Sequence, residues 1–242
     1  LLYLGAPFVN LFCMLCGTLL AWEWATFVPN QKNALYAAAY TSSVVMVSFL
    51  PGFYFILAML VMLIITAVVW LKAKAEEHRW LLVLGVPYIT LGIGSLNWFY
   101  ELTNNVLLIW FVLVVWGVDV GGYLVGSTVK GPKLAPSISP NKTWSGLVGG
   151  MLLAALVSYL YFRFWDINMR GWFALAAAVL AVVAQCGDLI ESKIKRHLGL
   201  KDSSNLIPGH GGIFDRIDGL IFAAPFAVVA FLVLVFSLVE VG

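Results

Sequence analysis

The chain has 242 residues, of which 62% are hydrophobic and only 11% are charged, and its formal net charge at pH 7 is +2. Soluble domains carry about 25% charged residues, so this composition excludes an ordinary soluble protein. Long apolar runs, instead of alternating strands, predict an all-α, polytopic transmembrane helix bundle. There is no basic tail and no basic patch interleaved with aromatic residues, so we expect no nucleic-acid partner.

About eight apolar runs follow one another, each long enough, or nearly so, to cross a bilayer. They lie at about 1–27, 33–50, 53–71, 80–98, 105–126, 144–163, 171–190 and 218–239. The sequence shows no strong internal repeat and no linker typical of a domain boundary. We therefore predict a single integral membrane domain over 1–242, with N-terminal spans in 1–110 and catalytic helices in 111–242.

Basic residues gather in alternate connections between the runs. The connections at 28–32, 72–79, 127–143 and 191–217 hold 12 Lys and Arg, whereas the other set holds Arg170, with Arg163 at its edge. Positive charge marks the cytoplasmic side of a membrane protein, so the loops 127–143 and 191–217 are expected there. This orientation puts Leu1 outside and predicts one further helix upstream. We expect the functional part of the protein on the cytoplasmic side of the membrane.

An acidic residue lies within the fifth apolar run. A carboxylate in hydrocarbon is costly and usually faces a bundle interior, a cavity or a partner. Helical spacing places Asp119, Gly122, Tyr123 and Gly126 on one face, where the glycines allow a helix or a ligand to approach closely. The structural alternative is an Asp paired with a Lys or with a helix end.

The segment from Ser139 to Thr143 precedes a helix predicted to begin near Trp144. Hydroxyls, the amide of Asn141 and the ammonium of Lys142 at a helix N-terminus are typical of a phosphate-binding cradle, because free N–H groups and the positive end of the helix dipole face the anion. The segment is not a Walker A loop. An ordinary helix cap with positive-inside lysines is the alternative.

The stretch from 188 to 218 concentrates charge at the membrane margin. Four side chains share one helical face at spacings i, i+3, i+4 and i+7: Asp188, Glu191, Ser192 and Lys195. Asp215 and Asp218 share a face where the last span begins. Carboxylates from two helix ends suit Mg²⁺, which takes a few hard oxygen ligands and leaves the rest to water and phosphate. A solvated positive-inside loop explains the basic residues but not these acids.

A longer pattern extends over the same stretch and beyond. It is made of Ser192, Lys195, Arg196, Lys201, Asp202, His210, Gly211, Gly212, Asp215, Arg216 and Asp218. This pattern resembles the C-terminal signature of the phosphatidate cytidylyltransferases, also called CDP-diacylglycerol synthases. The segment from Ser139 to Trp144 is similar to a second element of that family. One departure is Ser145, which stands where Glu is common and puts any role for that Glu in doubt here.

The resemblance implies the reaction of CTP with phosphatidic acid, giving CDP-diacylglycerol and pyrophosphate, with Mg²⁺ and room for a second cation. It implies Asp188 and Asp215 as metal ligands, with Asp218 as a ligand or an orienting group. Phosphate would be bound by Lys142, Lys195, Arg196 and Arg216. Ser139, Asn141 and Thr143 would contact the nucleotide triphosphate. The remaining expected substrate-binding residues are Asp119, Ser192, Lys201, His210, Gly211 and Gly212.

Other functions stay open at this point. Intramembrane acids and helices broken by Gly or Pro also mark transporters. Another CTP-using lipid enzyme, such as a polyprenol kinase or a cytidylyltransferase for an ether lipid, would carry similar chemistry. Release of pyrophosphate instead of CDP separates the transferase from the kinase. A homodimer is an open alternative to a monomer, and membrane lipid is expected as a partner in each case.

Overall fold

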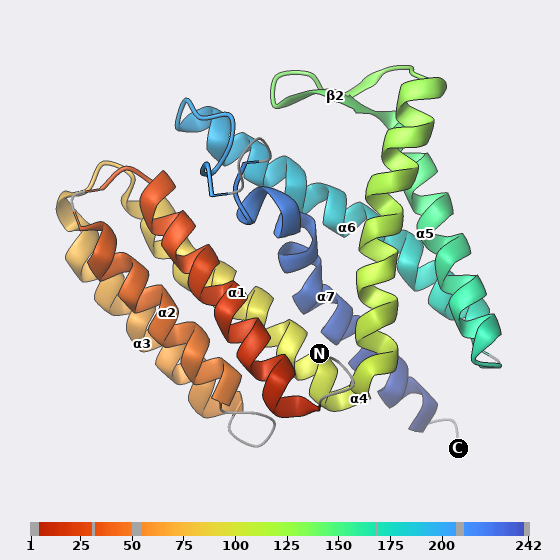
Figure 1. The fold of residues 1–242 in the computed structure, drawn as a ribbon, viewed down its shortest axis with the longest axis horizontal. Helices are drawn as coiled ribbons and strands as arrows, with labels where there is room; N and C mark the ends of the chain where they lie inside the picture. The colour runs from red at the N-terminus through yellow and green to blue at the C-terminus, as the bar shows by residue number, and fades with distance from the viewer. Residues whose placement is uncertain (1–4, 31, 50–54, 168, 207–210, 240–242) are drawn as a thin grey trace. The chain divides into compact units, whose positions relative to one another are not determined.

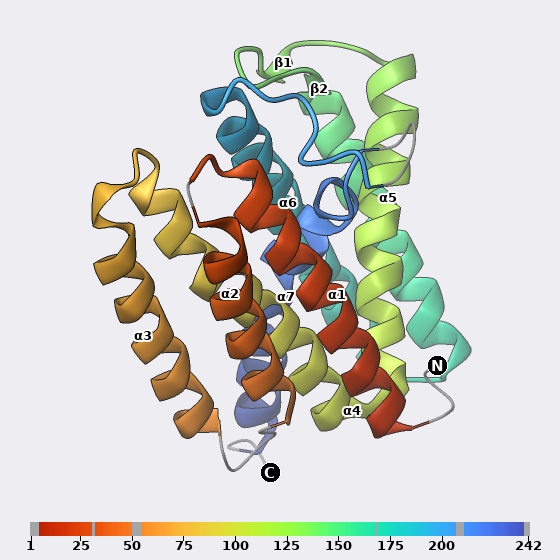
Figure 2. The ribbon, with the colours of Figure 1, turned by 60° about the vertical axis from the view of Figure 1, so that its left-hand side comes forward.

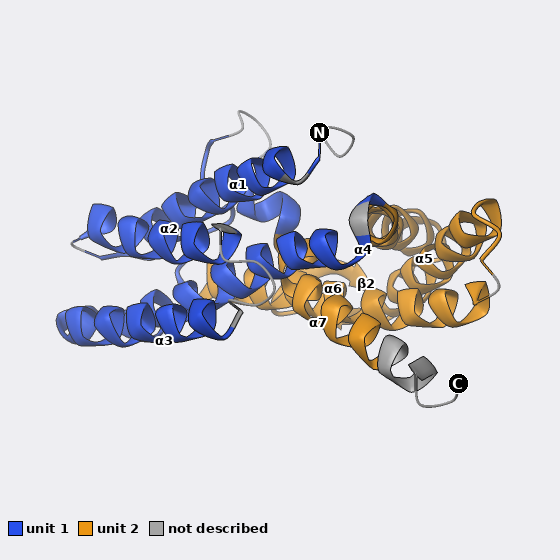
Figure 3. Cartoon of the chain, turned by 90° about the horizontal axis from the view of Figure 1, so that it is seen from below, with its two compact units in different colours: residues 1–105, 198–217 blue, residues 106–197, 218–242 orange. Residues whose placement is uncertain are grey.

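The structure, a computed structural model, describes residues 5–30, 32–49, 55–167, 169–206 and 211–239 (Figure 1, Figure 2). They form two compact units, drawn in two colours in Figure 3. Unit 1 comprises 1–105 and 198–217, and unit 2 comprises 106–197 and 218–242. The expected substrate-binding residue His210 lies outside the described residues, as does Leu1. The single-domain organisation stays a prediction.

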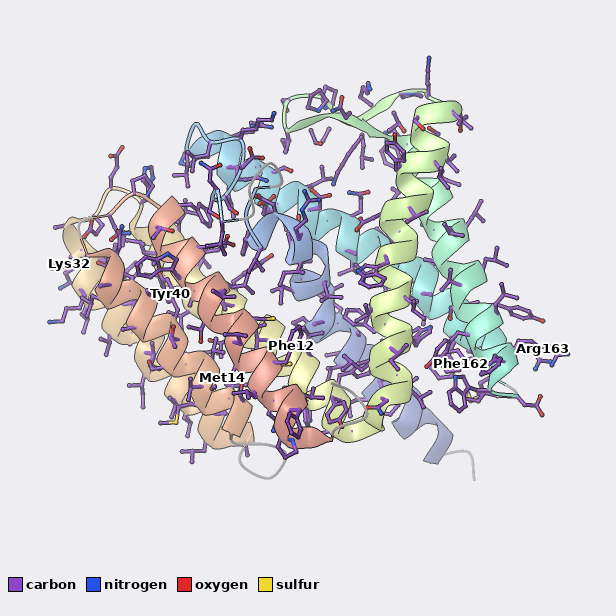
Figure 4. All side chains as sticks on the ribbon, in the orientation of Figure 1. Phe12, Met14, Lys32, Tyr40, Phe162 and Arg163 are labelled. Atoms are coloured by element: carbon purple, nitrogen blue, oxygen red, sulfur yellow. The ribbon has the colours of Figure 1, made fainter. Side chains whose placement is uncertain are left out.

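Unit 1 is a group of helices. It contains α1 (Ala6–Phe27), α2 (Asn33–Phe49), α3 (Phe55–Lys72), the short 3-10 helix η3 (Ala73–Ala75) and the first part of α4 (Arg79–Thr128). α1, α2 and α3 lie side by side (Figure 1, Figure 2). Trp24 of α1 donates a hydrogen bond to the carbonyl of Leu81 at 3.0 Å, and Tyr40 of α2 donates to that of Leu82 at 2.6 Å. Figure 4 labels Tyr40 on α2. These bonds give the polar tips of two buried aromatics a partner and fix α1 and α2 to the start of α4.

Unit 2 contains the rest of α4, a β-hairpin and three helices. Its elements are β1 (Lys133–Ala135), β2 (Ser139–Thr143), α5 (Trp144–Phe164), α6 (Arg170–His197) and α7 (Phe214–Val239), except that residues 214–217 at the start of α7 belong to unit 1. The strands are antiparallel, with Ala135 opposite Ser139. Both of these residues precede a proline, and residues before proline avoid the helical conformation and favour the extended one. The hairpin therefore replaces much of the plain loop predicted at 127–143.

Small residues let α4 and α5 approach closely within unit 2. A Cβ added to Gly121 of α4 would lie 2.6 Å from the carbonyl oxygen of Gly149 of α5. A Cβ added to Gly146 of α5 would lie 2.8 Å from the carbonyl oxygen of Gly122. Both positions exclude any side chain, and this approach brings the Asp119 face of α4 beside the start of α5.

α5 also packs against α6 (Figure 2). Near the far end of α5, where Figure 4 labels Phe162 and Arg163, the ring of Phe162 lies 4.0 Å from that of Phe173 in α6. Trp110 of α4 donates a hydrogen bond to the hydroxyl of Ser158 at 2.8 Å. The contact between the two phenylalanine rings joins α5 to α6, and the hydrogen bond from the Trp110 indole joins α4 to α5.

The all-α transmembrane class is confirmed. Within the described residues, seven helical segments are long and apolar enough to cross a membrane. The run predicted at 33–50 corresponds to α2, which has 17 residues. The runs predicted at 80–98 and 105–126 correspond to two candidate spans, Arg79–Thr103 and Asn105–Thr128, but the residues between these runs are helical and not a loop, so both spans belong to α4. No Gly or Pro occurs between 95 and 116 to end that helix.

Candidate active site

A cavity of about 590 Å³ lies within unit 2, between α4, the hairpin, the start of α5 and the middle of α6. The four residues that helical spacing placed on one face of α4 all line it: Asp119, Gly122, Tyr123 and Gly126. Four residues from the expected phosphate and metal sites line it too: Asn141, Lys142, Thr143 and Asp188. Segments separated by up to about 70 residues of sequence thus converge on one volume.

The start of α5 forms one wall of the cavity. Thr143 is the N-cap of α5, and its hydroxyl accepts a hydrogen bond from the N–H of Gly146 at 3.1 Å. The N–H of Trp144 donates to the carbonyl of Pro132 at 3.1 Å. The predicted cradle of free N–H groups was therefore wrong for these two amides. An anion here would rely on donors other than these two amides and on the positive end of the helix dipole.

Ser145, at the position where the resembled family commonly has Glu, has a structural role. Its hydroxyl donates to the carbonyl of Lys130 and lies 3.0 Å from the hydroxyl of Thr143. These contacts tie the segment that follows α4 to the start of α5.

Lys142 and Asp188 form an ion pair within the cavity. The lysine is in β2 and the aspartate is in α6, and their side chains are 20% and 33% exposed. Asp188 also accepts a hydrogen bond from Ser192, one turn further along α6, at 3.3 Å. The partly exposed pair joins the expected phosphate site to the expected metal site and stays accessible to a ligand.

Three carboxylates form a cluster that includes the Asp188 of this pair. Asp188 and Glu191 of α6 and Asp218 of α7 each offer one oxygen, and these oxygens lie within 4.8 Å of one another. Glu191 is 3% exposed and pairs with Lys195 at 2.9 Å. Oxygens on opposite sides of a Mg²⁺ ion are about 4.2 Å apart, so the set is suited to one such ion. The sequence placed Glu191 on the correct face but did not include it among the ligands.

Asp215 belongs to unit 1, one helical turn before Asp218. Its Oδ2 accepts hydrogen bonds from the N–H of Gly212 at 2.8 Å and of Ser203 at 3.0 Å. This carboxylate thus closes the loop that leads into α7. That Asp215 shares a metal with Asp188 stays a prediction.

Gly211 and Gly212 of the signature are required for different reasons, the first for its backbone conformation and the second for the lack of space around it. Gly211 has φ +78°, a conformation that other residues rarely adopt. A Cβ at Gly212 would meet the hydroxyl of Ser203 and lie 2.5 Å from Oε1 of Glu23. The loop therefore requires glycine at both places for its own geometry.

The other expected site residues are more dispersed. Ser139 begins β2 and, in the described part of the chain, is outside the cavity lining. Three basic residues are exposed: Arg196, Lys201 and Arg216. Sequence reasoning missed Lys130, Lys133 and Gln185, which line the cavity. Gln185 gave one signal, as a polar residue in an apolar run one helical turn before Asp188.

Comparison with known proteins identifies the family. Residues 1–234 match the cytidylyltransferase family. The chain belongs to that family. It is 42% identical over 146 residues to a phosphatidate cytidylyltransferase of Staphylococcus aureus (strain COL), and 40% identical to one of Staphylococcus haemolyticus (strain JCSC1435). Each match covers 59% of this chain and 55% of the relative, so the chain spans about half the length of these relatives.

Proposed function

We propose that this member of the cytidylyltransferase family transfers the cytidylyl group of CTP to phosphatidic acid, giving CDP-diacylglycerol and pyrophosphate. The observation that carries the proposal is a cavity lined by Lys142, Asp188 and the start of α5, with the carboxylates of Glu191 and Asp218 clustered around that of Asp188. Cations and acids side by side fit a triphosphate together with its counter-ion. The names of the staphylococcal relatives support the same reaction.

The lipid phosphate is the nucleophile in this reaction. A phosphate monoester has a second pKa of about 6, so it is largely dianionic at pH 7 and needs no general base. One of its oxygens attacks the α-phosphorus of CTP, and the bond from that phosphorus to the oxygen of the β-phosphate breaks. The electron pair leaves with pyrophosphate. The main barrier is the approach of two anions, which positioned positive charge lowers.

In this proposal, Lys142 supplies that charge. An ammonium group has three donors, so Lys142 can bond to Asp188 and to a phosphate oxygen at the same time. Lys130 and Lys133 line the same cavity and add positive charge. Asn141 and the start of α5 hold the triphosphate in line with the lipid phosphate, which supplies the orientation part of catalysis.

The acidic cluster is the proposed place for Mg²⁺. Asp188, Glu191 and Asp218 would hold the ion, with Asp215 as the ligand that the family resemblance implies. Bound there, the ion supplies charge that offsets the triphosphate and the departing pyrophosphate. Lys195 keeps Glu191 oriented toward the cluster.

The cavity is proposed to open on the cytoplasmic side of a bacterial inner membrane. Lys130, Lys133 and Lys142 all belong to the region 127–143, and basic residues of this kind mark the cytoplasmic face. Basic side chains at that margin also attract anionic lipid head groups. Phosphatidic acid would then reach the cavity from the membrane, and CTP from the cytoplasm.

The test is an assay of the purified protein in detergent, with CTP labelled at the α-phosphate, phosphatidic acid and Mg²⁺. We expect label in the lipid and one pyrophosphate for each labelled lipid. Release of CDP with label absent from the lipid would indicate a kinase instead. Absence of any CTP-dependent product with phosphatidic acid would contradict the proposal.

A further inference from the structure

Glu23 is a buried acid that the proposed chemistry does not use. It lies in α1, in an apolar run, and it is 1% exposed. An acidic side chain in such a place is costly unless it is well bonded. Its partners therefore indicate its role.

In the described residues, the recorded hydrogen-bond partners of the Glu23 carboxylate come from the segment between α6 and α7, called the signature loop here (198–213), and from the first residue of α7. Its Oε1 accepts a hydrogen bond from the hydroxyl of Ser204 at 2.5 Å and from the N–H of Ile213 at 2.9 Å. Its Oε2 accepts from the N–H of Phe214 at 2.7 Å. The first N–H groups of a helix have no partner within the helix, and a negative charge is favourable there. Glu23 thus caps α7 from a helix about 190 residues earlier in the sequence.

The residue beside this cap is held by aromatic packing. Phe214 is 1% exposed, and its ring lies 5.3 Å from that of Trp24 and 5.7 Å from those of Phe27 and Tyr88. Trp24 is the neighbour of Glu23 in α1. One site in unit 1 therefore binds both the backbone and the side chain where α7 begins.

Glu23 and Asp215 divide the loop between them. Asp215 binds the N–H groups of Ser203 and Gly212, while Glu23 binds the hydroxyl of Ser204 and the next two N–H groups. The two carboxylates thereby join residues 203–204 to residues 212–214. The same loop leads directly into the first turn of α7, which carries Asp215 and is followed by Asp218.

We propose that Glu23 is a positioning residue for the reaction: it fixes the signature loop, and through the loop it orients Asp215 and the first turn of α7. This inference rests on the proposed function for its effect on turnover, but its effect on the loop is independent of that function. Glu23 touches no substrate in this account.

Hydrogen exchange of the protein in detergent, followed by mass spectrometry, measures how well the backbone amides of the loop are protected. In Glu23→Gln, an NH₂ group replaces one carboxylate oxygen. A backbone N–H that donated to that oxygen then faces another donor, and its hydrogen bond is lost. We expect amide exchange in peptides covering 203–206 and 211–217 to be about tenfold faster, the effect of one lost charge-assisted hydrogen bond. Peptides from α2, α3 and the hairpin are the internal reference, and Glu77→Gln, at an exposed position in unit 1, is the matched control.

Two further variants keep the test decisive if Glu23→Gln folds poorly. Ser204→Ala removes one partner from the loop side and should accelerate exchange in the same peptides by a smaller factor. Glu23→Asp keeps both acceptor oxygens and should recover part of the protection. Equal exchange in wild type and all three variants would overturn the proposal, as would an acceleration spread evenly over α1, α2 and α3.

Kinetics separate positioning from general stability. For Glu23→Gln we expect kcat to fall about tenfold while the KM for CTP changes less than about twofold, because the variant alters orientation and not nucleotide contacts. A lower yield of folded protein with unchanged kcat per folded molecule would overturn the positioning role. If the wild-type protein itself makes no CDP-diacylglycerol, the proposed function fails, and hydrogen exchange still decides whether Glu23 holds the loop.

Discussion

Lys142 and Asp188 pair within one cavity, although they belong to a strand and a helix separated by all of α5. The pair connects a residue expected to bind phosphate with one expected to bind metal. Each side chain neutralises the charge of the other. Replacing either one by a neutral residue therefore leaves the remaining charge partly buried and without its ion-pair partner.

Replacing Lys142 should weaken nucleotide binding more than lipid use. Lys142→Ala removes charge-assisted hydrogen bonds worth about 1.5–3 kcal/mol, so we expect the KM for CTP to rise at least about tenfold. The KM for phosphatidic acid should change less. Steady-state kinetics with each substrate varied in turn give both values. Lys193→Ala, at an exposed position on α6, is the control, and an unchanged KM for CTP would end the role of Lys142 in binding phosphate.

Asp188→Asn should nearly abolish turnover while the protein still folds and inserts. The variant removes a carboxylate that belongs both to the ion pair and to the acidic cluster. We expect kcat to fall at least about 100-fold, the upper end of the loss for groups that merely support a metal ligand. Asp166→Asn, exposed at the end of α5, should have wild-type activity. Near-normal turnover of Asp188→Asn would remove it from the site.

The Mg²⁺ dependence distinguishes two sets of ligands. EDTA should abolish activity and added Mg²⁺ should restore it. If the acidic cluster holds the ion, then Glu191→Gln and Asp218→Asn should each raise the Mg²⁺ concentration for half-maximal activity by about tenfold or more. Activity is measured against free Mg²⁺ for each variant. A shift confined to Asp188→Asn and Asp215→Asn would favour the ligand pair implied by the family resemblance and exclude Glu191.

The close contact of α4 and α5 should be sensitive to one added methyl group. Gly121→Ala places a carbon 2.6 Å from the carbonyl oxygen of Gly149, so the helices must separate. We expect a loss of about 1–3 kcal/mol in the free energy of unfolding, as for other overpacked sites. Gly171→Ala is the matched control, because nothing lies within 4 Å of its added Cβ. Thermal unfolding in detergent compares the two, and equal midpoints would contradict the packing account.

Much of unit 2 could be predicted from the sequence because its signals are local. The helical spacing of Asp119, Gly122 and Tyr123 predicted one face, and all three line the cavity. The helix expected near Trp144 begins at that residue and is capped by Thr143. The face shared by Asp188 and Glu191 was likewise correct, since both contribute to the acidic cluster.

What the sequence could not predict depends on contacts between distant segments. Glu23 is one acid in an apolar run, and no spacing relates it to Phe214, whose N–H it binds. The pairing of Lys142 with Asp188 could not be predicted either, because the sequence indicated a separate role for each residue and no spacing that relates them. The continuation of α4 through 99–104 was missed for another reason: two adjacent asparagines suggest a turn, but they are tolerated inside a helix at a cost of well under 1 kcal/mol each.

The most direct test of the account is product formation by wild type and Asp188→Asn, from labelled CTP and phosphatidic acid with and without Mg²⁺. The account predicts labelled CDP-diacylglycerol and an equal amount of pyrophosphate from wild type with Mg²⁺, and almost none from the variant or after EDTA. Labelled lipid formed equally well by Asp188→Asn would contradict it.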